Sequence, residues 1–199
     1  MTKPPLDPTA LAASLDSPSG GAGTDRPAHA TGTRPDPIIH DDLNMRIGRD
    51  GTWFYHGSPI ARKPMVKLFA SVLSRDEDGV YWLTTPVEKG RVEVDDAPFL
   101  AVGLEVGGAE RDQVLRFRTN IDDEVTAGPD HPIRVALDPA SREPAPYLLV
   151  RGRLEALIAR SVFYELVELG VEEAVGGETH YGVWSAGSFF AIGSLEDAP

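Results

Sequence analysis

LNMRIGRDGTWFYH, the stretch over residues 43–56, decides how the folded part of this chain begins. Residues 43–47 alternate apolar and polar side chains, and residues 52–56 are rich in aromatic side chains, as β-strands are. Asp50-Gly51 lies between the two runs, and an Asp-Gly pair in that position is a strong signal for a β-hairpin. The stretch therefore predicts an antiparallel hairpin.

A helix and a second hairpin are predicted to follow. Pro64 is tolerated in the first turn of a helix, and apolar residues then recur at helical spacing up to about Arg75. Residues 80–84 and 90–94 read as two strands, joined by a Pro-containing loop over residues 85–89. The first half is thus predicted to be hairpin, helix, hairpin.

The second half repeats this order of strands, helix and aromatic hairpin. A long helix is predicted from Leu154 to Leu169, apolar on more than one face and therefore expected to pack between the halves. Strands are predicted at residues 99–106, 113–119, 124–127, 133–137, 147–150, 181–184 and 188–192, with a Pro-rich loop over 139–146. The expected class is α+β, with two related subdomains, each mainly antiparallel strands with one helix.

The N-terminal end differs in composition from the rest. Residues 1–37 are rich in Pro, Gly and Ala and contain no aromatic residue, so they are predicted to form a disordered tail. The expected division is a tail over 1–37, an N-terminal subdomain over 38–97 and a C-terminal subdomain over 98–199. The tail is also a candidate tether for a protein partner.

The composition bounds the compartment and the chemistry. The chain has 199 residues and no cysteine, which excludes disulfides, thiol nucleophiles and zinc–thiolate sites and suits a reducing compartment. No apolar run approaches the roughly 20 residues of a membrane-spanning helix, and no secretory signal is recognisable. We therefore expect a cytoplasmic protein without a membrane partner.

The charge is distributed unevenly. A net charge of -12 argues against binding to long nucleic acids, whose phosphates are held by basic surfaces. Residues 43–75 nevertheless carry six Lys or Arg against Asp50 alone, which is +5 and leaves -17 for the remainder. Such a basic stretch could focus a small anion. Alternatively, these cations are the solvated surface of the hairpin and helix.

Most catalytic signatures are missing: there is no HExxH motif, no Walker loop, no Rossmann glycine fingerprint and no nucleophile elbow. No two of the five histidines have the i, i+4 spacing that puts two metal ligands on one helical face. Asp95-Asp96 is the most suggestive acidic pair, although Asp also caps turns at strand ends. We predict no cofactor, metal site or catalytic residue.

Several polar and aromatic residues remain as candidates for binding. Thr85, Glu88 and Lys89 share one predicted loop, and Thr119-Asn120 ends a strand. Aromatic rings such as Trp53 could stack on a base, although core packing is the alternative. The predicted ligand-binding residues are Arg46, Arg49, Trp53, Tyr55, Arg62, Lys67, Thr85, Glu88, Lys89, Asp96, Thr119, Asn120, Arg151 and Trp184.

Eight segments of the body resemble a bacterial family of domains of unknown function. They are residues 42–47, 50–60, 67–73, 83–89, 94–99, 117–120, 150–157 and 182–190. The resemblance covers the body from about Asp42 to Gly193 and leaves the tail uncovered. The resemblance implies a duplicated α+β core with a pleckstrin-homology-like second half. It also implies a pocket between the halves for a nucleotide-type ligand, and a link to signalling.

Three functions follow as hypotheses. The first is a non-enzymatic ligand-binding module in signal transduction or stress response, in which Arg46, Arg49, Arg62 and Lys67 receive an anionic, nucleotide-type molecule. The second is an enzyme that acts on a phosphorylated substrate with Asp, Glu and Lys as acid–base groups. The third is a protein-interaction adaptor. The missing signatures favour binding without turnover.

Overall fold

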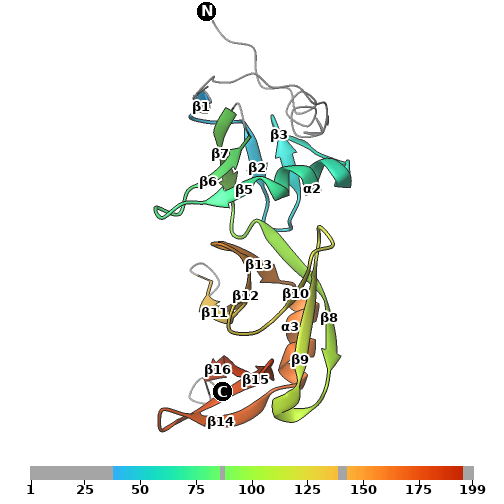
Figure 1. The fold of residues 1–199 in the computed structure, drawn as a ribbon, viewed down its shortest axis with the longest axis vertical. Coiled ribbons are helices and arrows are strands. Elements are labelled where there is room, and N and C mark those ends of the chain that lie inside the picture. Colours follow the sequence, from blue (N-terminus) through green and yellow to red (C-terminus); the bar gives the residue numbers. More distant parts are fainter. Residues whose placement is uncertain (1–37, 86–87, 139–142, 195–199) are drawn as a thin grey trace, which may run out of the picture. The chain divides into compact units, whose positions relative to one another are not determined.

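The computed structural model describes residues 38–85, 88–138 and 143–194 (Figure 1). The predicted disordered tail, residues 1–37, lies outside these ranges. Two compact units are present, one with the described residues up to Arg46 together with Phe54–Glu93, the other with Ile47–Trp53 and the chain from Val94 onward. Among the described residues strands dominate both units, and each unit shows one α-helix there, so the α+β class is confirmed. No helix among the described residues could cross a membrane.

The N-terminal sheet has the strand order β4-β3-β2-β7-β6-β5, and β1 pairs with β7 in parallel. Its elements are β1 (Ile38–His40), β2 (Met45–Ile47), β3 (Trp53–Tyr55), β4 (Ser58–Pro59), α2 (Lys63–Ser71), β5 (Leu73–Arg75), β6 (Tyr81–Thr84) and β7 (Glu88–Val94). The predicted hairpin at Asp50-Gly51 is confirmed: Gly51 has φ +79°, and the Asp50 carboxylate accepts from the Thr52 amide. Only Gly adopts such a φ without strain.

The core of the first unit forms around α2 and the strands. Phe69 and Ala70 of α2 are buried, as are Leu83 of β6 and Val92 of β7. Gly90 of β7 lies directly against the Leu43 side chain, and a Cβ there would collide with it. The packing therefore requires a residue without a side chain at this point of the strand.

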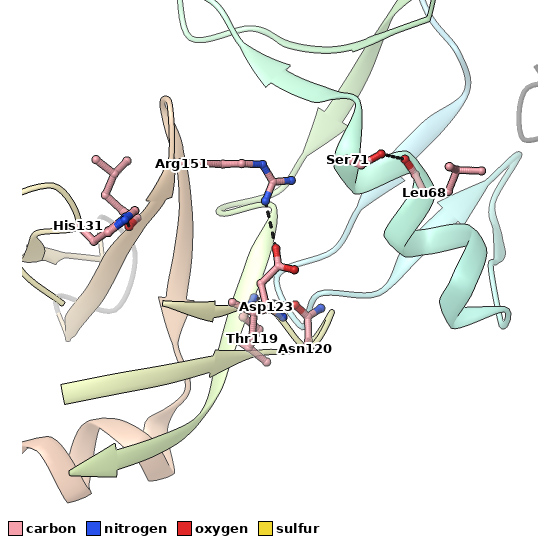
Figure 2. Close-up of polar contacts among 9 residues, drawn as sticks. Leu68, Ser71, Thr119, Asn120, Asp123, His131 and Arg151 are labelled. Atoms are coloured by element: carbon pink, nitrogen blue, oxygen red, sulfur yellow. Dashed lines mark hydrogen bonds and ion pairs between the residues drawn. The ribbon is translucent and has the colours of Figure 1, made fainter. Parts of the chain in front are cut away.

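The predicted helix ends earlier than expected. α2 stops at Ser71, whose hydroxyl donates to the Leu68 carbonyl oxygen (Figure 2), and residues 73–75 form β5 against β6. Leu73 is buried in β5, and it would also lie on the apolar face of a longer helix. The spacing of apolar residues therefore could not distinguish the strand from a continued helix. The predicted loop over 85–89 is also too long, because β7 already begins at Glu88.

The second unit contains a six-stranded sheet, β10-β9-β8-β13-β12-β11, and a three-stranded sheet, β14-β15-β16. Its elements are β8 (Phe99–Gly107), η1 (Glu110–Asp112), β9 (Val114–Thr119), β10 (Glu124–Thr126), β11 (Ile133–Leu137), β12 (Pro144–Arg151), β13 (Leu154–Ile158), α3 (Arg160–Glu168), β14 (Val171–Val175), β15 (Glu178–Ser185) and β16 (Ser188–Ser194). β13 pairs with β8 in parallel, and the other neighbours are antiparallel. α3 contacts both β8 and β15 (Figure 1).

The predicted helix from Leu154 to Leu169 is wrong in its first third. Residues 154–158 form β13, a central strand between β8 and β12, and the helix begins only at Arg160. Alternate residues of β13 are buried, which is the period of two of a strand. Ala159, extended with φ -58° and ψ 147°, separates the two elements.

Two further expectations for the second unit need correction. Residues 144–146, expected in a loop, open β12 and pair with β11. β14 was not predicted, because its VEEAV sequence has little apolar alternation and borders a Gly-Gly turn. The strands at 99–106, 113–119, 124–127, 133–137 and the closing hairpin are confirmed within one to three residues.

A buried hydroxyl links the two sheets of the second unit. Ser185 of β15 accepts from the Leu115 amide of β9 at 2.9 Å and donates to the Ala127 carbonyl at 2.7 Å. The residue is completely buried, and Phe117, Leu148 and Leu166 belong to the same unit's buried core.

Candidate functional site

The second unit carries a surface groove that combines apolar and cationic groups. Its volume is 620 Å³ and its lining exposes more apolar than polar surface. We call it the α3 groove, and it is lined by Arg49, Leu100, Glu143, Pro144, Ala145, Pro146, Leu157, Ile158, Ala159, Arg160, Phe163 and Tyr164. Such a mixture is typical of sites that hold a small molecule by its apolar body and orient it by a few polar groups.

The floor of the α3 groove comes from neighbouring strands. Leu157 of β13 is directly opposite Leu100 of β8 and Tyr147 of β12 in the sheet register. Because strand side chains alternate, Ala156 and Ile158 enter the core while Leu157 points to the other face and is half-buried. The alternation of side chains along β13 therefore leaves apolar Leu157 on the outer face of the sheet.

One wall of the groove comes from the first turns of α3. Arg160 and Tyr164 are one helical turn apart, and the Arg160 Nε donates to the Tyr164 hydroxyl at 3.0 Å. This hydrogen bond is the main reason why the pKa of Arg160 is raised, so the guanidinium stays charged. Phe163 is half-buried beside them, whereas Tyr164 is 56% exposed. The wall thus presents a cation next to two aromatic rings.

The Arg160 charge is only loosely compensated. Its Nη2 lies 3.4 Å from the Glu143 Oε1, and the two side chains are 71% and 60% exposed. An exposed pair of this kind contributes about 0–1 kcal/mol. An incoming anion could therefore replace the Glu143 carboxylate at little cost.

Arg49, the predicted cation that also lines the groove, is held much more firmly. Its Nη1 donates to the Asp138 Oδ2 at 2.6 Å, and its Nε lies 3.1 Å from the Asp96 Oδ2. The hydrogen bond to Asp138 raises the pKa of Arg49. The structure therefore brings the predicted residues Arg49 and Asp96 together, but as partners of each other.

Tyr147 extends this arrangement. Its hydroxyl donates to the Asp96 Oδ1 at 2.7 Å, and burial, followed by this hydrogen bond, raises the pKa of Tyr147 to about 12. The Arg134 guanidinium lies 4.2 Å from the centre of the Tyr147 ring and forms a bidentate ion pair with Glu155, with both distances 2.6 Å. Two guanidinium groups thus face three carboxylates, which leaves no excess of positive charge here.

The predicted residues of the first unit lie in several places. Arg46 stacks over the Phe54 ring at 4.5 Å and lines a separate hollow of 430 Å³. The Tyr55 ring lies edge-on to the His56 ring at 4.3 Å. Arg62 and Lys67 are exposed, the former at the N-terminal end of α2 and the latter along it.

The residues of the predicted loop are used within the protein. The buried Thr85 hydroxyl accepts from the Glu88 amide at 3.0 Å and donates to the Glu88 carbonyl oxygen at 3.1 Å. The Glu88 carboxylate lies 3.6 Å from His40, and the Lys89 ammonium lies 4.5 Å from the centre of the Trp82 ring. The hydrogen bonds of Thr85 join it to the start of β7.

Trp53 corrects one expectation, because its side chain is only 1% exposed. It is a core residue and has no ring face free for a ligand in this structure. Trp184 is half-buried, with the Arg111 guanidinium 5.0 Å from its ring centre and Phe189 tilted against it at 5.5 Å. Core packing and cation–π contacts, the alternatives to stacking on a base, account for both rings.

Thr119, Asn120 and Arg151 organise the β9–β10 turn (Figure 2). The Thr119 hydroxyl accepts from the Asp123 amide at 3.0 Å, and Figure 2 shows the Arg151 guanidinium directed at the Asp123 carboxylate, 3.1 Å away. Asn120 accepts from the Leu100 amide at 3.1 Å and donates to the Gly51 carbonyl oxygen at 3.2 Å. These side chains position backbone, and Arg151 also borders an open, polar hollow of 630 Å³.

Sequence reasoning missed Arg160, Phe163 and Leu157. The spacing of one helical turn between Arg160 and Tyr164, both inside the predicted helix, could have found Arg160, whereas the helix prediction hid the position of Leu157 on a strand. Among the residues that the structure describes, no group of three or more His, Asp or Glu side chains could hold a metal ion.

The fold and the groove define a strand-rich α+β protein of two units with an amphipathic surface site on the second. The chain belongs to the DUF1285 family: residues 33–97 match the domain of unknown function (DUF1285), N-terminal domain, and residues 98–192 match the protein of unknown function (DUF1285), C-terminal domain. The resemblance to a family of domains of unknown function is thereby confirmed.

Two crystal structures of DUF1285 family proteins are similar to the chain. The protein from Silicibacter pomeroyi DSS-3 is 46% identical, with a TM-score of 0.81 over 96% of this chain and 97% of that one. The protein from Shewanella baltica OS155 is 31% identical, with a TM-score of 0.49 over 62% of this chain and 90% of that one. No curated protein matches the chain.

Proposed function

We propose that this protein is a ligand-binding module of the bacterial cytoplasm that takes a small anionic molecule with a planar or apolar body, of the nucleotide type, in the α3 groove. The observation that carries the proposal is the position of the loosely paired Arg160 beside Tyr164, above an apolar floor. The proposal includes a role in signal transduction or stress response, in which the protein binds its ligand without chemical turnover.

The chemistry of the α3 groove suits such a ligand. A guanidinium group donates two parallel hydrogen bonds to a phosphate or carboxylate. An aromatic ring stacks on a base with about 1–3 kcal/mol in binders of single-stranded nucleic acid. Arg160 and the exposed Tyr164 offer these two contacts side by side. The net charge of -12 disfavours a long polyanion and is compatible with a small one.

Arg160 is a better anion receptor than Arg49. Arg49 is held by Asp96 and Asp138, and an anion that drew it away would leave these two carboxylates without their shared cation. Arg160 has only a long, exposed ion pair with Glu143, which costs little to break. Arg46, Arg62 and Lys67 stay predicted cationic contacts of the first unit. We further propose that the second unit is pleckstrin-homology-like and related to the first, supported by the strands and the one α-helix in the described part of each.

A thermal-shift screen of the full chain with nucleotides, sugar phosphates and aromatic carboxylates tests the proposal. A ligand present at 100 times its dissociation constant stabilises the folded state by about 2.7 kcal/mol. Arg160→Ala and Tyr164→Ala should each weaken binding of any stabilising compound at least tenfold.

Arg116→Ala is the matched control. Arg116 is also an exposed arginine of the second unit in a long pair, 3.7 Å from Glu105, but it does not line the α3 groove. The dissociation constant of the Arg116→Ala variant for a stabilising compound should stay within twofold of the wild-type value. The proposal fails if no compound stabilises the protein, or if the Arg160 and Tyr164 variants bind as the wild type does.

A further inference from the structure

The strand β14 occupies an edge of the three-stranded sheet β14-β15-β16. Its five residues pair with β15 from Val171 opposite Gly182 to Val175 opposite Glu178, and within the described ranges no strand pairs with its other side. An unpaired strand edge presents a row of amide and carbonyl groups to any extended chain that can align with it.

We propose that β14 is a docking edge for an extended basic segment of a partner protein, which adds to the sheet as a fourth strand. In this mode of recognition the main-chain hydrogen bonds supply affinity, and alternate side chains supply specificity. The inference is independent of ligand binding in the α3 groove, because β14 contributes no residue to the groove lining.

The side chains of β14 leave apolar surface uncovered. Val171 and Val175 are 44% and 48% exposed, and they share one face of the strand with Glu173 between them. β-Branched residues on an added strand would pack against both valines, since directly opposite side chains in a sheet are close neighbours. The edge therefore selects a partner with strand-forming residues.

The charge around β14 selects a basic partner. Residues 164–179 contain five glutamates and no Lys or Arg: Glu165, Glu168, Glu172, Glu173 and Glu178. Arg111 binds both carboxylate oxygens of Glu173, at 3.0 and 3.1 Å. The other four glutamates are exposed, and Glu172 lies on β14 itself. Lys or Arg residues on an added strand would pair with Glu172, and the net negative charge of this part of the chain would attract them at longer range.

A second copy of this chain is a poorer occupant. Antiparallel pairing of two β14 strands in full overlap places Glu173 opposite Glu173 and Glu172 opposite Ala174. In this pairing the exposed Glu172 of each copy faces an alanine and gains no cation, whereas a basic segment would supply one. Charge complementarity thus separates the basic segment from self-association.

The test measures binding of a fluorescein-labelled peptide of alternating Lys and Val to the full chain by anisotropy. We expect binding that weakens with salt, no binding of a Glu-Val peptide, and slower hydrogen exchange in the complex for those amides of residues 171–175 that point away from β15. Glu172→Lys should raise the dissociation constant at least tenfold, because it reverses a charge on the edge itself.

Glu124→Lys is the matched control, since Glu124 is exposed on β10, an edge strand of the other sheet in the same unit. It should leave the dissociation constant within twofold, and circular dichroism should show both variants folded. Equal binding to the Glu172→Lys variant, or exchange protection outside β14, overturns the proposal. A dimer in sedimentation that Glu172→Lys dissociates, together with no peptide binding, also overturns it and assigns the edge to a second copy.

Discussion

Replacing Ser185 by alanine tests how the second unit is held together. The Ser185 hydroxyl is completely buried and links the Leu115 amide, at 2.9 Å, with the Ala127 carbonyl, at 2.7 Å. The change leaves one backbone donor and one acceptor without this partner inside the protein. Each buried group left unsatisfied costs about 1–3 kcal/mol, so the two groups together predict a loss of about 2–6 kcal/mol in the free energy of unfolding.

Urea unfolding followed by circular dichroism measures this loss. With a slope of roughly 2 kcal/mol per molar urea, in the middle of the usual range, the midpoint of the affected transition should fall by about 1–3 M. Ser161→Ala is the control, because Ser161 is an exposed serine of α3, and it should change stability by less than about 0.5 kcal/mol. If Ser185→Ala is as stable as this control, the hydroxyl does not join the two sheets in the way described.

Two further predictions concern titration and packing. Because the folded-state pKa of Tyr147 is about 12 and the unfolded value is near 10, the neutral phenol is favoured by folding, and the associated stability is present below about pH 10 and lost as pH rises toward 12. Absorbance titration at alkaline pH should show a late-titrating tyrosine that disappears in Tyr147→Phe, and an unchanged titration curve would contradict the assignment. Gly90→Ala should destabilise the first unit by about 1–3 kcal/mol, because the added methyl group collides with Leu43. Urea unfolding of Gly90→Ala alone and combined with Leu43→Ala measures the collision, and equal losses in both backgrounds would exclude it.

Much of the fold was predictable because the relevant signals are local. Asp50-Gly51 between two strand-prone runs predicts a hairpin, since the turn needs a residue that tolerates a positive φ. The alternation in residues 99–106 and 113–119 identifies the two strands that became β8 and β9. The failures occurred where one apolar pattern suits two structures, at Leu73 and at Leu154–Ile158.

The candidate site was less predictable than the fold. The sequence supplied the cations of residues 43–75, and a cation is a reasonable anion receptor until its neighbours are known. Asp138, 89 residues further along the chain, hydrogen-bonds to Arg49, and this distant partner changes the role of that guanidinium. Trp53 was a candidate for stacking with core packing as the alternative, and it is buried in the core.

By itself, the amino-acid order determined the hairpin at Asp50-Gly51, most of the strands and the α+β class, because turn propensities and side-chain periodicity act over a few residues. Only the tertiary structure decided that residues 154–158 are a central strand and that β14 lies at a sheet edge. It also decided that Arg49 is held by two carboxylates while Arg160 is loosely paired. These outcomes depend on strand pairing and ion pairing between residues far apart in the chain, whose energies no local pattern records.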